Sequence, residues 1–157
     1  MGKQHEYTMV DLPLIISISA YDAGDVVGGQ IEIPMAAIPV GGMVAEALLF
    51  DDDDRKAALS LHLFDSQPAV IADQAAFALA FADLKKEIGE IAFATAGYRT
   101  HNGNAYSRVG GNDALTGEKI EFRTKKSGTL WAYLVTPGGV TYLTTTALYL
   151  RLKLLVN

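Results

Sequence analysis

The clearest pattern in the chain is a strict alternation of leucine with polar or aromatic residues near its C-terminus. The sequence VTYLTTTALYLRLKLL, residues 140–155, has leucine at every second position from 148 to 154, alternating with Tyr149, Arg151 and Lys153. Successive side chains of a β-strand point to opposite faces of a sheet, so this period of two predicts a long strand with one dry and one wet face. We expect a strand here, not a tail.

The same alternation occurs on both sides of four consecutive aspartates, Asp51 to Asp54. Residues 44–50 and 57–64 each alternate with a period of two, and about five polar residues separate them. Two such runs predict a β-hairpin with the aspartates at its tip. A calcium site is the alternative, because calcium prefers carboxylate oxygens, but the glycine and distal glutamate of an EF-hand loop are missing. The pattern therefore favours a solvated turn.

Other short apolar runs predict further strands. We expect strands at 12–21, at 26–35 with a bulge or tight bend at Gly28-Gly29, and at 90–98. Two more are expected up to about Thr124 and through Trp131, with turns at KKSG (125–128) and PGG (137–139). The stretch 99–118 is polar and rich in glycine, which predicts a long loop with an edge strand near 106–109.

Only residues 70–89 show a helical period. Phe77, Phe81, Leu84 and Ile88 are spaced as on one helical face. Asp73 and Asp83 are candidate N-caps and Gly89 a candidate C′ residue, which predicts two short helices near 73–79 and 83–88.

Together these elements predict an all-β fold, a β-sandwich or jelly-roll-like barrel of about eight strands with two short inserted helices. The alternative is an α+β domain in which 73–88 packs across one sheet face. Residues 1–12 are expected to be a flexible N-terminal arm that orders only against a neighbour, and 13–157 to be a single β domain. The chain contains no recognisable linker or internal repeat.

Composition narrows the function. The formal net charge is −5, which argues against a general nucleic-acid binder with a basic face. The absence of cysteine excludes disulfides, thiolate zinc sites and a cysteine nucleophile. The first twelve residues lack the apolar stretch of a secretion signal, and no apolar run approaches the roughly 20 residues of a membrane helix. We expect a protein made in a cytoplasm that binds no membrane.

Candidate catalytic residues are few. The three histidines, His5, His62 and His101, are not at metal-ligand spacing, and the pattern around His62 favours a partly buried structural role. His101 could approach Ser107 and Asp113, but no GxSxG elbow frames a nucleophile. The segment GGNDALTGEK fails the phosphate-loop template, because Lys119 does not directly follow Gly117. We therefore expect no catalytic, cofactor or metal site, and a protein that is not an enzyme.

The aromatic residues of the last third allow two interpretations. Trp131, Tyr133, Tyr142 and Tyr149 could line a carbohydrate groove, with 99–118 as a companion loop. Cross-strand packing is the other interpretation, and it is the one favoured for aromatic residues on a sheet. A carbohydrate-binding β-sandwich module remains an alternative function.

The order of these signals resembles a known family. The stretches SAYDAGDVVGGQIEIP, LHLFDSQP, ADQAAFALAFADLKKEIGEI and GTLWAYLVTPGGVTYLTTTALYLRLKLL are similar to those of small structural proteins encoded by tailed bacteriophages. The likeness runs from about Ser19 to the C-terminus and consists of glycine turns and strand patterns.

This resemblance implies a virion component without an active site. It points to a capsid decoration or cement protein that binds the outside of the major capsid protein shell, with a head-fibre, neck or tail role as the alternative. The implied location is the capsid surface, after synthesis in the host cytoplasm. A homo-oligomer is expected, because an assembly covers strand edges, and the resemblance favours a trimer.

Overall fold

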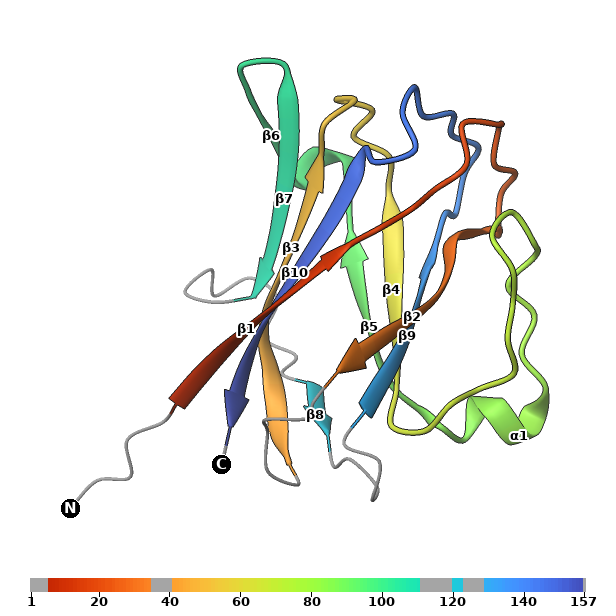
Figure 1. Cartoon of the computed structure of the whole chain (residues 1–157), viewed down its shortest axis with the longest axis vertical. Coiled ribbons are helices and arrows are strands. Elements are labelled where there is room, and N and C mark those ends of the chain that lie inside the picture. Colours follow the sequence, from red (N-terminus) through yellow and green to blue (C-terminus); the bar gives the residue numbers. More distant parts are fainter. Residues whose placement is uncertain (1–5, 35–40, 111–119, 123–128, 157) are drawn as a thin grey trace.

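The computed structural model describes residues 6–34, 41–110, 120–122 and 129–156, which form two antiparallel sheets packed face to face (Figure 1). The first sheet has the strand order β1-β10-β3-β7-β6, and β8 also pairs with β3. The second sheet has the order β2-β9-β4-β5. The described strands do not close into a barrel. The all-β sandwich is thereby confirmed.

The strands are short to medium in length. The first sheet contains β1 (Glu6–Pro13), β3 (Gly42–Asp51), β6 (Tyr98–His101), β7 (Asn104–Gly110), β8 (Ile120–Phe122) and β10 (Leu148–Val156). The second contains β2 (Val26–Pro34), β4 (Leu59–Phe64), β5 (Glu87–Phe93) and β9 (Thr129–Val135). The helical elements are α1 (Phe81–Leu84) and a 3₁₀ turn, η1 (Thr95–Gly97).

The main core lies between the two sheets and is built from alternate residues of each strand. In β10 the leucines at 148, 150, 152 and 154 are buried, while Tyr149, Arg151 and Lys153 are not, as the sequence predicts. Leu59, Leu61 and Leu63 of β4 meet these leucines from the opposite sheet. The strand is shorter than expected, because 140–147 belongs to the connection that leads from β9 of the second sheet to β10 of the first.

The predicted hairpin around the aspartates is wrong. Strand β3 belongs to the first sheet and β4 to the second, so residues 52–58 cross from one layer to the other. Each strand pairs with partners distant in the sequence, such as β10 with β3 and β9 with β4. An alternating pattern indicates only that a strand has one buried face. A hairpin within one sheet and a crossing between two sheets both produce this pattern.

The two predicted helices at 73–79 and 83–88 are also wrong, apart from the single turn of α1. Residues 71–79 pass over the outer face of the second sheet without forming a helix, with a turn at 73–74 and every second side chain partly buried. Ile71, Phe77 and Leu79 pack there against a second cluster of buried residues, Val26, Phe64, Tyr133 and Val135. The Asp73 carboxylate does not cap a helix, since it accepts hydrogen bonds from the Tyr21 hydroxyl and the Gly28 N–H.

The expected flexible arm is a strand over most of its length. Residues 6–13 form β1, which pairs with β10 from Glu6–Val156 to Pro13–Tyr149. Leu12 is buried in the main core, and Val10 packs against it. The strand expected at 12–21 is correspondingly wrong, because β1 ends at Pro13. The first five residues lie outside the described part of the chain.

Glycine-containing turns confirm the sequence prediction at one place and correct it at another. The pairing of β2 with β9 shifts register between Val27 and Ile31, where Gly28 and Gly29 have φ of 81° and 73°. The predicted long loop begins instead with a β6–β7 hairpin, whose two-residue turn Asn102-Gly103 has φ of 52° and 82°. Positive φ at both turn positions suits a tight hairpin, and asparagine followed by glycine accepts it. The rest of that loop, 111–119, and the KKSG turn lie outside the described residues.

No helix within the described residues is long and apolar enough to cross a membrane.

Candidate functional site

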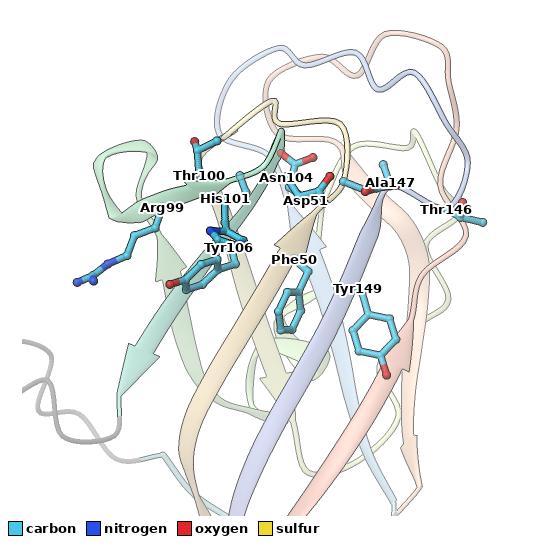
Figure 2. A pocket seen from close by; sticks show the side chains of 12 residues that line it. Phe50, Asp51, Arg99, Thr100, His101, Asn104, Tyr106, Thr146, Ala147 and Tyr149 are labelled. Carbon is cyan, nitrogen blue, oxygen red and sulfur yellow. The ribbon is translucent and has the colours of Figure 1, made fainter.

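Three aromatic side chains lie next to one another on the outer face of the first sheet. Tyr149 of β10 is the register partner of Phe50 in β3, and Phe50 is the partner of Tyr106 in β7. The Phe50 ring centroid is 5.9 Å from that of Tyr149 and 6.4 Å from that of Tyr106. Figure 2 shows the three rings side by side across adjacent strands. We call Tyr149, Phe50 and Tyr106 the aromatic row.

The aromatic row lines a hollow of about 790 Å³ at one end of this sheet. The β6–β7 hairpin, which extends past the end of the sheet in Figure 1, supplies Arg99, Thr100, His101 and Asn104 to its lining. The turn after β3 and the start of β10 complete it with Asp51, Asp52, Thr146 and Ala147. The hollow thus joins apolar ring surfaces to hydroxyl, amide, carboxylate and cationic groups.

Charged residues continue the face beyond the hollow. The Arg151 guanidinium lies 5.9 Å from the Phe50 ring centroid, and its Nε donates to the Asp11 Oδ1 at 2.5 Å. This hydrogen bond and the positive charge of Arg151 hold the pKa of the Asp11 carboxyl below its ordinary value. The same hydrogen bond and the negative charge of Asp11 raise the pKa of Arg151. Farther along, the Lys153 Nζ lies 4.4 Å from the Tyr7 ring centroid.

The aspartates that border the hollow organise the chain instead of forming a free acidic tip. Asp51 is buried, and its carboxylate accepts hydrogen bonds from the N–H groups of Asp53 at 3.1 Å and Lys56 at 2.8 Å. Burial raises the pKa of Asp51, although these N–H donors oppose the shift. The Asp53 carboxylate accepts from the N–H groups of Leu143 and Thr144, which ties two loops together.

The solvated turn predicted for this segment is therefore correct only in part. Asp52 is exposed, but Asp51 is buried and Asp53 is partly buried. Within the described residues, no group of three or more histidine, aspartate or glutamate side chains is arranged to hold a metal ion. The carboxylates instead satisfy backbone donors at a place where the chain crosses between layers, a common role of aspartate in turns.

The two histidines in the described part of the chain, His62 and His101, lie apart from each other. His62 lies on the outer face of the second sheet, with its Nδ1 2.7 Å from the Glu87 Oε1 and its ring against Phe77. His101 lines the hollow, but Ser107 is buried on the inner face of β7, so the two do not meet. His5, Asp113, Gly117 and Lys119 lie outside the described residues.

The four aromatic residues considered for a carbohydrate groove do not share a surface. Trp131 and Tyr133 lie on the outer face of the second sheet beneath 71–79, Tyr142 is in the main core, and Tyr149 is on the outer face of the first sheet. A groove containing both Trp131 and Tyr149 is therefore wrong. The actual neighbours of Tyr149 are Phe50 and Tyr106, whose outward positions in alternating runs are the only signal the sequence offers for them.

A second surface lies along the edge strand β1 and the residue pair that follows it. Every second residue from Tyr7 to Ile15 is exposed: Tyr7, Met9, Asp11, Pro13 and Ile15, which we call the β1 row. Tyr7, Met9 and Ile15 expose 55%, 48% and 69% of their surface, so the row is mostly apolar although it faces solvent. Within the described residues β1 pairs only with β10, which leaves its other edge open.

No model of a known protein family matches this chain, and no curated protein sequence is similar to it at a significant level.

Proposed function

We propose that this protein is a non-enzymatic structural component of a tailed-bacteriophage virion, a decoration or cement protein that binds the outside of the major capsid protein shell. The observation that carries the proposal is the β1 row, an apolar surface on an open strand edge. The identity of the partner rests on the resemblance of the chain to phage structural proteins.

The β1 row has the properties of a protein-binding surface. Burying apolar surface contributes about 25 cal/mol per Å², so four apolar side chains exposed in one line favour contact with another protein. The open edge of β1 adds unpaired backbone donors and acceptors, and these can pair with a strand of a partner. A capsid subunit offering an extended segment satisfies both requirements.

A homo-oligomer on the shell, most plausibly a trimer, is part of the same proposal. Contacts between neighbouring copies would cover strand edges that a single copy exposes. The shell raises the effective concentration of adjacent copies, so association of the free protein can be weak. The choice of three copies rests on the resemblance. Cross-linking on particles, with light scattering of the free protein, tests it, and isolated copies without mutual contacts contradict it.

The decisive experiment is co-sedimentation with capsids assembled from the major capsid protein of the same gene cluster. We expect the wild-type chain to sediment with them, and Met9→Asp and Ile15→Asp to lose at least tenfold in apparent affinity. Val70→Asp is the matched control, because Val70 is 73% exposed but directly precedes the segment 71–79, which covers the other sheet. Failure of the wild-type chain to bind, or equal binding of all variants, contradicts the proposal.

A further inference from the structure

We propose that the hollow lined by the aromatic row is a binding site for a neutral saccharide. This inference is independent of the capsid proposal, since the hollow and the β1 row share no residue, although Tyr149 of the hollow is the register partner of Pro13. A virion component with such a site would hold the shell on one surface and a glycan on another.

The aromatic row is open, which distinguishes it from the aromatic residues of the second sheet. Trp131 and Tyr133 are also on an outer sheet face, but Ile71, Phe77 and Leu79 cover them. Phe50, Tyr106 and Tyr149 are only partly buried, and among the described residues no segment crosses over them. The ring plane of Phe50 makes angles of 35° with that of Tyr106 and 72° with that of Tyr149, so the three rings present both faces and edges to a ligand with C–H groups.

The polar lining specifies a ligand rich in hydroxyl groups. Thr100, Asn104 and Thr146 offer neutral donors and acceptors, and in Figure 2 they lie above the aromatic row. The exposed carboxylate of Asp52 makes no hydrogen bond within the described residues, so it can accept hydrogen bonds from ligand hydroxyls. The Arg99 guanidinium points away from the aromatic row (Figure 2). Pockets that combine apolar surface with a few placed polar groups are typical of small-molecule sites, and about 790 Å³ is within their range.

The charges favour a neutral ligand over a polyanion. The lining contains one guanidinium, that of Arg99, and two aspartate side chains, Asp51 and Asp52, so the hollow is not a basic groove. The guanidinium of Arg151 is already paired with Asp11. Single-stranded nucleic acid also stacks on aromatic rings, but it requires a basic groove that follows its backbone, and this chain carries a net charge of −5.

The walls of the hollow are fixed before a ligand arrives. Hydrogen bonds from the Leu143 and Thr144 N–H groups to Asp53 hold residues 140–147 against the turn formed by Asp51 to Asp54. The Thr100 hydroxyl donates to the Asp54 Oδ1 at 3.3 Å, which links the hairpin to the same turn. A site that is already ordered loses less conformational entropy on binding, which favours affinity.

The test begins with the full chain on an array of neutral, sialylated and uronic-acid glycans, followed by titration of the best neutral glycan. We expect Tyr149→Ala and Tyr106→Ala each to weaken binding at least tenfold, and Tyr149→Phe to bind nearly as wild type because the ring remains. Tyr7→Ala is the matched control, since Tyr7 is on the same sheet face but outside the hollow. Circular dichroism of each variant verifies folding.

The outcomes separate the two proposals. Loss of glycan binding in Tyr149→Ala with capsid co-sedimentation unchanged supports the saccharide site, and Met9→Asp should show the reverse. No signal from any neutral glycan, stronger binding of acidic glycans or of a thymidine oligonucleotide, or undiminished binding by both alanine variants would overturn the inference, whatever happens with capsids.

Discussion

Tyr21 and Tyr142 pack edge to face in the main core, with ring centroids 6.3 Å apart and ring planes at 75°, yet only one hydroxyl is hydrogen-bonded. Tyr21 donates to the Asp73 Oδ1 at 2.7 Å and accepts from the Ser17 N–H at 2.7 Å. The Tyr142 hydroxyl is buried without a hydrogen-bond partner in the described part of the chain. The two tyrosine rings are equally buried, but their hydroxyl groups should contribute differently to the stability of the fold.

The same substitution at these two positions should have opposite effects on stability. Tyr21→Phe leaves the Ser17 N–H without its acceptor and is expected to cost about 1–3 kcal/mol of unfolding free energy. Tyr142→Phe removes an unsatisfied buried hydroxyl, so the free energy of unfolding should stay unchanged or rise. Urea denaturation of both variants measures the difference. Equal losses would show that the Tyr142 hydroxyl has a partner.

Alanine substitutions across the aspartates should distinguish a structural turn from a solvated tip. Asp51→Ala and Asp53→Ala each deprive two backbone N–H groups of their acceptor and should each cost about 1–3 kcal/mol. Asp52→Ala is the internal control, because its exposed side chain makes no such bond and should change stability by less than about 0.5 kcal/mol. Thermal unfolding of the three variants compares them. A uniform response would contradict the crossing connection seen here.

The burial of Asp51 also predicts a specific dependence on pH. Its pKa is raised above the ordinary value of 3.8, so the folded chain binds this proton more tightly than the unfolded chain. The contribution of Asp51 to stability is therefore full below 3.8 and falls as pH rises through the higher folded pKa. Since Asp51→Asn lacks this titration, its penalty should be larger at about pH 3 than at about pH 7.

Denaturation of the wild type and Asp51→Asn at both pH values tests this sign. The titration of Asp11, which shifts in the opposite direction, is common to both proteins and cancels in the difference. A penalty that grows with pH would mean that the carboxylate is stabilised by its N–H donors more than it is penalised by burial.

Substitutions in β1 should separate the core role of the strand from its surface role. Leu12→Ala should cost about 2–5 kcal/mol, because Leu12 is buried between the sheets. Met9→Ala, on the exposed side of the same strand, should leave stability within about 0.5 kcal/mol of wild type. Guanidinium unfolding measures both. If Leu12→Ala proves silent, the N-terminal segment is the flexible arm that the sequence suggests.

The local sequence pattern predicts an element correctly where the backbone geometry of that element alone produces the pattern. The alternation over 148–154 predicted which residues of β10 are buried, since the period of a strand follows from backbone geometry alone. Gly28-Gly29 predicted the irregularity in β2 because few other residues accept positive φ. From such elements the all-β sandwich class follows.

The local sequence pattern does not predict which strands pair with each other or which segment covers a sheet. An alternating run before and after Asp51 to Asp54 is compatible with pairing within one sheet or with two sheets, and only the competition of β7, β9 and β10 as partners decides between them. The helical spacing of Phe77 and Phe81 predicts a short helix at 73–79. Ile71, Phe77 and Leu79 instead cover the apolar outer face of the second sheet along a path that is not helical. Tertiary burial outweighs so weak a periodicity.

The sequence by itself therefore determined the class of fold, the two-sided character of its strands and the lack of a recognisable catalytic motif. The tertiary structure alone decided that Tyr149, Phe50 and Tyr106, which are far apart along the chain, meet on neighbouring strands beside the β6–β7 hairpin. The physical reason is that strand order and register arise from long-range pairing, whereas the pattern along a chain records only which face of each strand is buried.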